Sequence, residues 1–138
     1  PDDTTISNIK TMIRRSLNFF KEYGPVIQDG ITFSGGYTST INSGDADFLT
    51  KDTLWDFKVS KSSPKTGHTL QLLVYYLMGK HSNNNNFNMI NKLGIFNPRK
   101  NTIYLKEIAE IDTEIIQEVE QKVIGYNNNQ DDSKIIYV

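Results

Sequence analysis

The feature that most constrains the fold is a helical stretch at residues 69–78 that is apolar on nearly every side. Its apolar side chains are Leu70, Leu72, Leu73, Val74 and Leu77. A helix without a broad polar face must be buried by neighbouring elements. Strand-like sequence comes before and after it, so the chain predicts a sheet flanked by helices, an α/β or α+β domain.

A first helix is predicted near the beginning of the chain. Thr5 or Ser7 can act as its N-cap, and it ends before Gly24-Pro25. The apolar positions that predict its buried stripe are Ile6, Ile9, Met12, Ile13, Leu17 and Phe20. Three strands in an antiparallel meander are predicted after it, at residues 31–40, 45–50 and 53–60.

The second half of the chain predicts two more strands, at residues 92–96 and 102–106, and a last helix that Asp112 can cap. The buried stripe of that helix is expected at Ile115, Ile116, Val119, Val123 and Ile124. Residues 81–86 are rich in asparagine and predict a mobile loop without functional weight. Residues 135–138 predict either a terminal edge strand or the first residues of a further segment.

Composition narrows the classes of protein to which the chain can belong. The chain has 138 residues, so we expect one domain over residues 1–138 with a core of its own. Pro1 as the first residue leaves open that the chain is a fragment of a longer protein. No apolar run is long enough to span a bilayer, so no membrane partner is expected. The absence of cysteine excludes disulfides and cysteine-ligated zinc and fits a cytoplasmic location. With only two histidines, any metal would be held mainly by oxygen, which favours Mg²⁺ or Mn²⁺.

Charge is unevenly distributed along a chain whose net charge is −1. Near neutrality argues mildly against a general nucleic-acid-binding protein, but a local basic face can still bind phosphate. Lysines surround the central motif (Lys51, Lys58, Lys61 and Lys65), whereas residues 107–132 are strongly acidic. Solvated surface lysines are an equally weighted interpretation. The candidates for nucleic-acid contacts are Lys61, Lys65, His68, Arg99 and Lys100.

The strand at residues 53–60 presents two kinds of side chain. Side chains alternate along a strand, so Asp56 and Lys58 share one face, and Trp55, Phe57 and Val59 share the other. The apolar face anchors the strand, and the polar face presents a carboxylate and an ammonium at the border of a core. A surface strand with an exposed Asp and Lys gives the same pattern, and for this short motif alone that interpretation is favoured.

Two further groups give the motif its chemical meaning. Asp45 and Asp47 share a face of the preceding strand, and in a hairpin one of them can meet Asp56. Converging carboxylates repel each other and raise the pKa of one of them, a conflict that a divalent cation resolves.

On the helix, Gln71 and Tyr75 lie four residues apart, so they form a polar stripe on an otherwise apolar surface. The alternative interpretation of that stripe is a purely structural hydrogen bond from Gln71 to the backbone.

In this order and spacing, the motifs Gly44-x-x-Asp47, Asp56-x-Lys58 and Gln71-x-x-x-Tyr75 resemble the active site of the PD-(D/E)xK nuclease superfamily, in particular its RecB-like branch. The match covers residues 31–79. The resemblance implies a restriction-endonuclease-like αβββαβ core with a central mixed sheet. It implies Mg²⁺ or Mn²⁺ held by Asp47, Asp56 and the backbone carbonyl of Phe57. It also implies a catalytic Lys58, with Gln71 and Tyr75 supporting the site and contacting substrate.

The chain departs from the family pattern in several respects. The gap between Asp47 and Asp56 is short and implies a tight hairpin. The family often has another acid or histidine on the first helix, for which Glu22 is the candidate here. Without cysteine, an iron–sulfur cluster of the Cas4 kind is excluded, and without a Gly-x-x-x-x-Gly-Lys-Ser/Thr loop no ATPase motor is present.

Three interpretations follow. The first is a divalent-metal-dependent nuclease that hydrolyses DNA phosphodiester bonds, with RNA as an alternative substrate. The second is a nuclease-fold module that binds nucleic acid or supports assembly without cleavage. The third is an unrelated α+β domain with a chance match, in which Asp47, Asp56 and Lys58 would not converge. The sequence leaves endo- or exonuclease action, strand preference, oligomeric state and any partner domain open.

Overall fold

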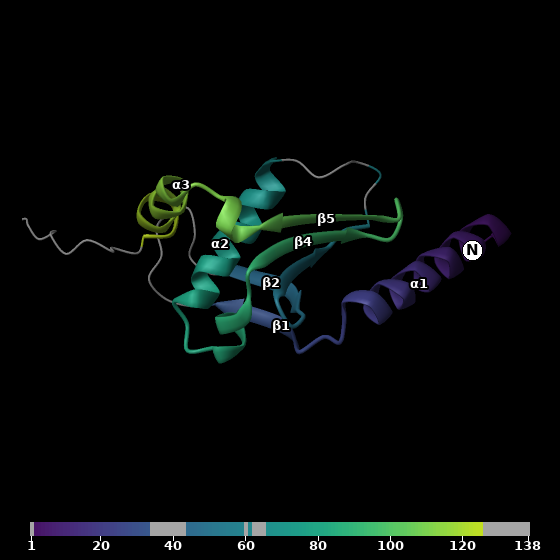
Figure 1. The fold of residues 1–138 in the computed structure, drawn as a ribbon. Helices are drawn as coiled ribbons and strands as arrows, with labels where there is room; N and C mark the ends of the chain where they lie inside the picture. Colours follow the sequence, from purple (N-terminus) through teal and green to yellow (C-terminus); the bar gives the residue numbers. More distant parts are fainter. Residues whose placement is uncertain (1, 34–43, 60, 62–65, 126–138) are drawn as a thin grey trace, which may run out of the picture.

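The computed structural model describes residues 2–33, 44–59, 61 and 66–125, with the backbone alone at residues 32–33, 44–47, 66 and 123. A five-stranded mixed sheet runs in the order β1-β2-β3-β4-β5, with helices on its two faces (Figure 1). The strands are β1 Gln28–Phe33, β2 Gly44–Leu49, β3 Thr53–Phe57, β4 Lys92–Asn97 and β5 Thr102–Glu107. The α-helices are α1 Asp3–Tyr23, α2 Thr66–Lys80 and α3 Thr113–Glu118. The predicted α/β class with a mixed sheet is confirmed.

Strand pairing follows the predicted order. β1, β2 and β3 form the expected antiparallel meander, and β4 pairs with β5 antiparallel. β3 pairs parallel to β4, which requires a crossover that α2 provides. β3 ends at Phe57, three residues before its predicted end, and of the first predicted strand residues 34–40 lie outside the described residues. The parallel pairing stops where Pro98 follows β4, because proline has no N–H to donate.

The main core lies between the sheet and α2. Leu49, Leu54, Leu93 and Ile95 face α2 from the strands, and α2 contributes Leu72, Leu73, Val74, Leu77 and Met78. α2 extends beyond its predicted ends and is buried along most of its length. The expected burial on every side is wrong at Leu70 and Gln71, which are exposed. The sheet and the other helices leave these two positions of α2 open to solvent.

A smaller aromatic cluster covers the opposite face of the sheet. Phe19 of α1 stacks on Phe96 of β4, with ring centroids 4.1 Å apart, and meets Trp55 of β3 edge-on at 4.7 Å. Phe48 of β2 completes this buried group. Gly94 is the strand partner of Trp55, and a Cβ at Gly94 would overlap the indole ring. The close packing of Trp55 on the sheet therefore depends on glycine at that position.

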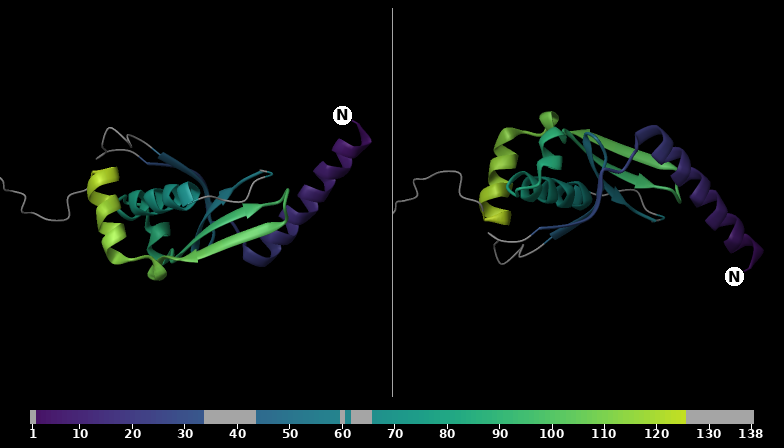
Figure 2. Two further views of the ribbon diagram at one scale, coloured as in Figure 1. Left: turned by 90° about the horizontal axis from the view of Figure 1, so that it is seen from above. Right: turned by 90° about the horizontal axis from the view of Figure 1, so that it is seen from below.

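Helix α1 packs on the sheet only through its C-terminal part. Figures 1 and 2 show its N-terminal half projecting beyond the sheet. The expected buried stripe is therefore wrong at four positions, which are exposed: Ile6, Ile9, Ile13 and Leu17. The predicted N-cap is also wrong, because Asp2 caps the helix by accepting from the Thr5 amide at 2.7 Å. The predicted end before Gly24-Pro25 is confirmed.

The helical segment that follows β5 packs against α2. Asp112 caps α3 as predicted, and a π-helical segment, Val119–Ile124, continues from it. Val119 and Ile124 are buried, whereas Ile115 is exposed against expectation. His81, just after α2, contacts the carboxylate of Glu120 at 2.9 Å. None of the helices in the described part of the chain has the length and hydrophobicity that crossing a bilayer requires.

The asparagine-rich stretch is more ordered than predicted. A 3₁₀ helix, Asn85–Met89, is capped by Asn84, and Phe87 within it is fully buried. The side-chain amides of Asn84 and Asn86 donate to the Gln28 side chain at 2.7 and 2.8 Å. This stretch is therefore tied to the first residue of β1 instead of forming a mobile loop.

Candidate functional site

The C-terminal end of β3 carries the central pair of the site. Leu54, two residues before Asp56, packs in the core beneath α2, and Trp55 packs on the opposite face. Alternation along the strand therefore places Asp56 on the α2 face. The Lys58 ammonium lies 3.1 Å from the Asp56 carboxylate, and their side chains are 35% and 18% exposed. Asp56 is thus a largely covered carboxylate whose charge is balanced by the neighbouring lysine.

The register between β2 and β3 brings the backbone of the first acidic motif to this pair. Phe48 pairs with Trp55 and Leu49 pairs with Leu54. The pairing itself ends at Phe48 and Trp55; continued by one residue, the same antiparallel register would set Asp47 opposite Asp56. The hairpin is as short as the spacing implies, since β2 ends at Leu49 and β3 begins at Thr53. The side chains of Asp45 and Asp47 lie outside the described residues.

The third motif lies on α2, which covers the same face of the sheet as Asp56. The Gln71 side-chain amide donates to the Tyr75 hydroxyl at 2.9 Å. Tyr75 is half-buried against the core, and Gln71 is exposed. His68 is half-buried in the first turn of the same helix. The two predicted residues therefore form a hydrogen-bonded pair at the border of the core, where Gln71 is open to solvent.

The structure does not bring Glu22 to the other candidates. Glu22 is exposed near the end of α1, which packs on the Trp55 face of the sheet, whereas Asp56 lies on the α2 face. Burial, followed by the charge and hydrogen bonding of Glu22, raises the pKa of the Tyr23 hydroxyl. The carboxylate of Glu22 thus interacts with its neighbour on the helix.

Three of the basic candidates, Lys61, Arg99 and Lys100, lie at one edge of the sheet. Arg99 and Lys100 follow β4, and Lys58 follows β3; these parallel strands end together, with the Lys58 amide donating to the Phe96 carbonyl at 2.9 Å. Lys61 is exposed beyond the same end of β3, and Lys65 lies outside the described residues. Lys51 precedes β3 and is therefore at the opposite end of that strand.

The turn that carries Arg99 and Lys100 is held by groups without a sequence motif. The buried Asn97 side chain accepts from the backbone amides of Arg99 and Lys100, at 2.9 and 3.2 Å. Arg15 of α1 donates to the carbonyls of Pro98 and Arg99, at 2.9 and 3.1 Å. In the sequence, the only signal for Arg15 is its basic charge on an amphipathic helix.

The donor set at the end of β3 fits a hard divalent cation in its chemistry. Asp47, Asp56 and the Phe57 carbonyl offer oxygen only, and Mg²⁺ typically takes one or two carboxylates and completes its shell with water and phosphate. Within the part of the chain that the structure describes, no three His, Asp or Glu side chains gather into a metal-binding group. The second carboxylate would have to come from Asp47.

No protein-family model matches this chain, and neither does any curated protein or solved structure with which it was compared.

Proposed function

We propose that this domain is a divalent-metal-dependent nuclease with a restriction-endonuclease-like core, related to the RecB-like branch of the PD-(D/E)xK superfamily. The observation that carries the proposal is the Asp56–Lys58 pair at the end of β3, on the sheet face that α2 covers. The register of β2 on β3, which would set Asp47 opposite Asp56 if it continued by one residue, supports it. The element order α1-β1-β2-β3-α2-β4 is the αβββαβ order of that core.

Each motif has a distinct role in the proposed reaction. Asp47, Asp56 and the carbonyl of Phe57 would hold Mg²⁺ or Mn²⁺. When bound, such a cation lowers the pKa of a coordinated water and stabilises negative charge on the phosphate. The Lys58 ammonium, beside Asp56, can orient the attacking water and balance the charge that develops on the phosphate. Gln71 and Tyr75 would support the site and contact substrate from α2.

The bonds that change are those of a phosphodiester hydrolysis. The water oxygen forms a bond to phosphorus, and the bond between phosphorus and the leaving ester oxygen breaks. One proton leaves the attacking water, and the leaving oxygen takes up a proton. The proposal applies to DNA, and RNA is the second substrate to be tested.

The test compares the wild-type protein with Lys58→Ala and Lys51→Ala. Each is incubated with linear DNA, circular DNA and single-stranded RNA, with Mn²⁺ or with a chelator. We expect metal-dependent cleavage that Lys58→Ala lowers about 10²- to 10⁴-fold, the usual range for a proton-transferring or charge-balancing group. Lys51→Ala removes the same charge at the other end of β3 and should cut like the wild type.

Other outcomes have equally definite meanings. Cleavage that survives in Lys58→Ala or in the chelator would refute the assigned site. Binding without cleavage of any substrate would leave a nuclease fold used as a binding module. Cutting of the circle would identify an endonuclease.

A further inference from the structure

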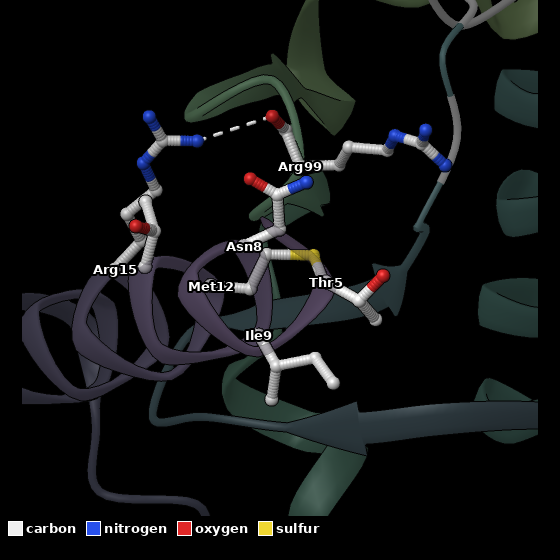
Figure 3. Close-up of a pocket in the computed structure, with 7 residues that line it drawn as sticks. Thr5, Asn8, Ile9, Met12, Arg15 and Arg99 are labelled. Atoms are coloured by element: carbon white, nitrogen blue, oxygen red, sulfur yellow. Dashed lines mark hydrogen bonds between the residues drawn. The ribbon is translucent and has the colours of Figure 1, made fainter. Parts of the chain in front are cut away.

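A polar groove runs along α1 beside the turn between β4 and β5. Its volume is about 490 Å³, and its walls are formed by one face of α1 and by Arg99 of the turn. Thr5, Asn8, Met12 and Arg15 succeed one another at intervals of three and four residues, so they lie along a single face of the helix. In Figure 3, Asn8 lies between the two arginines, and the Arg99 side chain extends away from Arg15.

The groove contains positive charge that the fold does not neutralise. Arg15 uses Nη1 to bond two backbone carbonyls, which accept hydrogen bonds without cancelling its charge. A guanidinium has five N–H donors, so donors remain for a ligand. Neither Arg15 nor Arg99 forms an ion pair with another described residue. Thr5, Asn8 and Thr11 add neutral hydrogen-bonding groups along the wall. The chemistry of the groove therefore suits an anion.

The surrounding segments are predominantly basic. Residues 4–21 and 98–106 contain no aspartate or glutamate, and the acid nearest the groove is Asp2, which caps α1 at Thr5. Their cations are Lys10, Arg14, Arg15, Lys21, Arg99, Lys100 and Lys106. Acidic residues instead dominate residues 107–120, which run from the far end of β5 into α3, away from α1 (Figure 1). A predominantly basic surface of this kind raises the local concentration of an oppositely charged polymer.

The groove lies at the same edge of the sheet as the candidate active site. The turn with Arg99 follows β4, and Lys58 follows β3, whose end pairs with β4 at Phe57 and Phe96. The projecting half of α1 extends beyond that edge in both views of Figure 2. Because Lys58 pairs with Asp56 on the α2 face and α1 covers the opposite face, a polyanion that contacts both Lys58 and the groove would pass over the common ends of β3 and β4, which a small free anion would not need to do.

We propose that this groove binds the sugar-phosphate backbone of a nucleic-acid strand, with Arg99 and Arg15 contacting phosphate next to the strand segment at Lys58. The identity of the ligand rests on the proposed function, but binding in the groove does not require cleavage. Hydrogen bonds from Arg15 and to Asn97 support the turn whose backbone carries the Arg99 side chain. The contacts are to the backbone and would be independent of base sequence.

The test measures binding separately from cleavage. Fluorescence anisotropy of a labelled single- or double-stranded DNA oligonucleotide is followed in chelator, as a function of salt, for wild type, Arg99→Gln and Arg14→Gln. Both variants lose one positive charge, but Arg14 lies about 100° from Arg15 around the helix and does not line the groove. We expect Arg99→Gln to weaken binding about tenfold, as for a lost charged hydrogen bond. The slope of log K against log salt should fall by about one.

Arg14→Gln should remain within about twofold of the wild type, because an exposed charge outside the groove acts only through the screened long-range field. Arg99→Gln is expected to fold, since its side chain is exposed and the bonds from Asn97 are to the backbone. Circular dichroism checks this. A second readout is amide exchange on the groove face of α1, which should slow on DNA binding in the wild type and not in Arg99→Gln.

The outcomes separate this inference from the proposed function. Selective weakening by Arg99→Gln in a protein that cuts nothing would support the groove and remove the nuclease. A protein that cuts normally while the two variants bind equally well would support the nuclease and overturn the groove. Failure of the wild type to bind any DNA would also overturn the groove.

Discussion

At the scale of single residues, Trp55 is the side chain whose environment is most completely specified. Its indole is fully buried, and its N–H donates to the Thr50 hydroxyl at 2.9 Å. A buried donor that loses its acceptor pays the cost of its desolvation. Because Trp55 directly precedes Asp56, a change in the packing of Trp55 would displace the strand that carries the candidate site.

Replacing Thr50 with valine should therefore destabilise the domain. The change keeps the shape of the side chain but leaves the Trp55 N–H without its acceptor, at a cost of about 1–3 kcal/mol. Urea unfolding followed by tryptophan fluorescence measures the difference, and Trp55 is the only tryptophan in the chain.

Thr102 provides the matched control for this change. Its hydroxyl is buried and has no hydrogen-bond partner among the described residues. Thr102→Val removes an unsatisfied polar group and should leave the free energy of unfolding unchanged or raised. Equal losses of unfolding free energy in both variants would mean that the hydrogen bond from Trp55 to the Thr50 hydroxyl contributes nothing specific to stability.

At the scale of elements, two glycines of α2 lie in opposite environments. A Cβ at Gly79 would overlap the ring of the fully buried Phe87, whereas Gly67 has open space around it. We expect Gly79→Ala to cost about 1–3 kcal/mol through overpacking. Gly67→Ala should gain up to about 1 kcal/mol, because alanine is the better helix former. Thermal unfolding of the two variants distinguishes packing from helix propensity. A change in the free energy of unfolding that has the same sign in both variants would contradict this account.

The pair Asp52–Lys92 fastens the start of β3 to the start of β4. A hydrogen bond from the Thr53 hydroxyl, and then the Lys92 ammonium at 3.0 Å, lower the pKa of Asp52. The Asp52 carboxylate in turn raises the pKa of Lys92. A lowered acid pKa stabilises the fold above the unfolded value, about 3.9, and this contribution is lost as the pH falls through the folded value.

Asp52→Asn should therefore destabilise the domain at neutral pH by less than about 1 kcal/mol, since both side chains are partly exposed. The difference from wild type should begin to decline as the pH falls below about 4 and be lost below the lowered pKa of Asp52, and it should shrink in about 1 M salt. Urea unfolding at several pH values measures it. A difference that persists at low pH would assign the effect to something other than charge.

The N-terminal half of α1 is expected to be the least stable helical segment in the described part of the chain. Its apolar side chains at Ile6, Ile9 and Ile13 are exposed, and short helices without packing are marginal in water. Hydrogen exchange should therefore be fast at residues 4–12 and slow in the buried part of α2. Equal protection of the two segments would mean that something covers α1 in solution.

At the scale of the whole molecule, the sequence predicted what depends on local periodicity. The alternation at residues 53–57 and the apolar stretch of α2 led to a sheet packed against a buried helix, and both are present. That the sheet is mixed was implied only by the family resemblance. The stripe of α1 was misassigned because periodicity reports amphipathicity but not how far a helix extends past its partner sheet. Arg15 could not be anticipated, since its partners lie more than eighty residues away.

Of the candidate site, the sequence anticipated the Asp56–Lys58 pair because two-residue spacing fixes which side chains share a strand face. It also paired Gln71 with Tyr75 on one helical face, although Gln71 was expected to be buried. The separation of Glu22 from Asp56 depends on which sheet face α1 covers, and that is decided by the aromatic packing of Phe19. No local pattern encodes that choice.

The distribution of charge over the molecule predicts how it meets an anionic partner. The net charge is −1, yet the cations of residues 4–21 and the acids of residues 107–120 lie at different ends. Two charge reversals change the net charge by equal amounts in opposite directions. Lys10→Glu gives a net charge of −3, and Glu110→Lys gives a net charge of +1. If net charge governs association with DNA, the two should shift the stopped-flow association rate equally in opposite directions. Because exposed charges act over only about 10 Å at 0.1 M salt, we expect Lys10→Glu to slow association several-fold and Glu110→Lys to change it little.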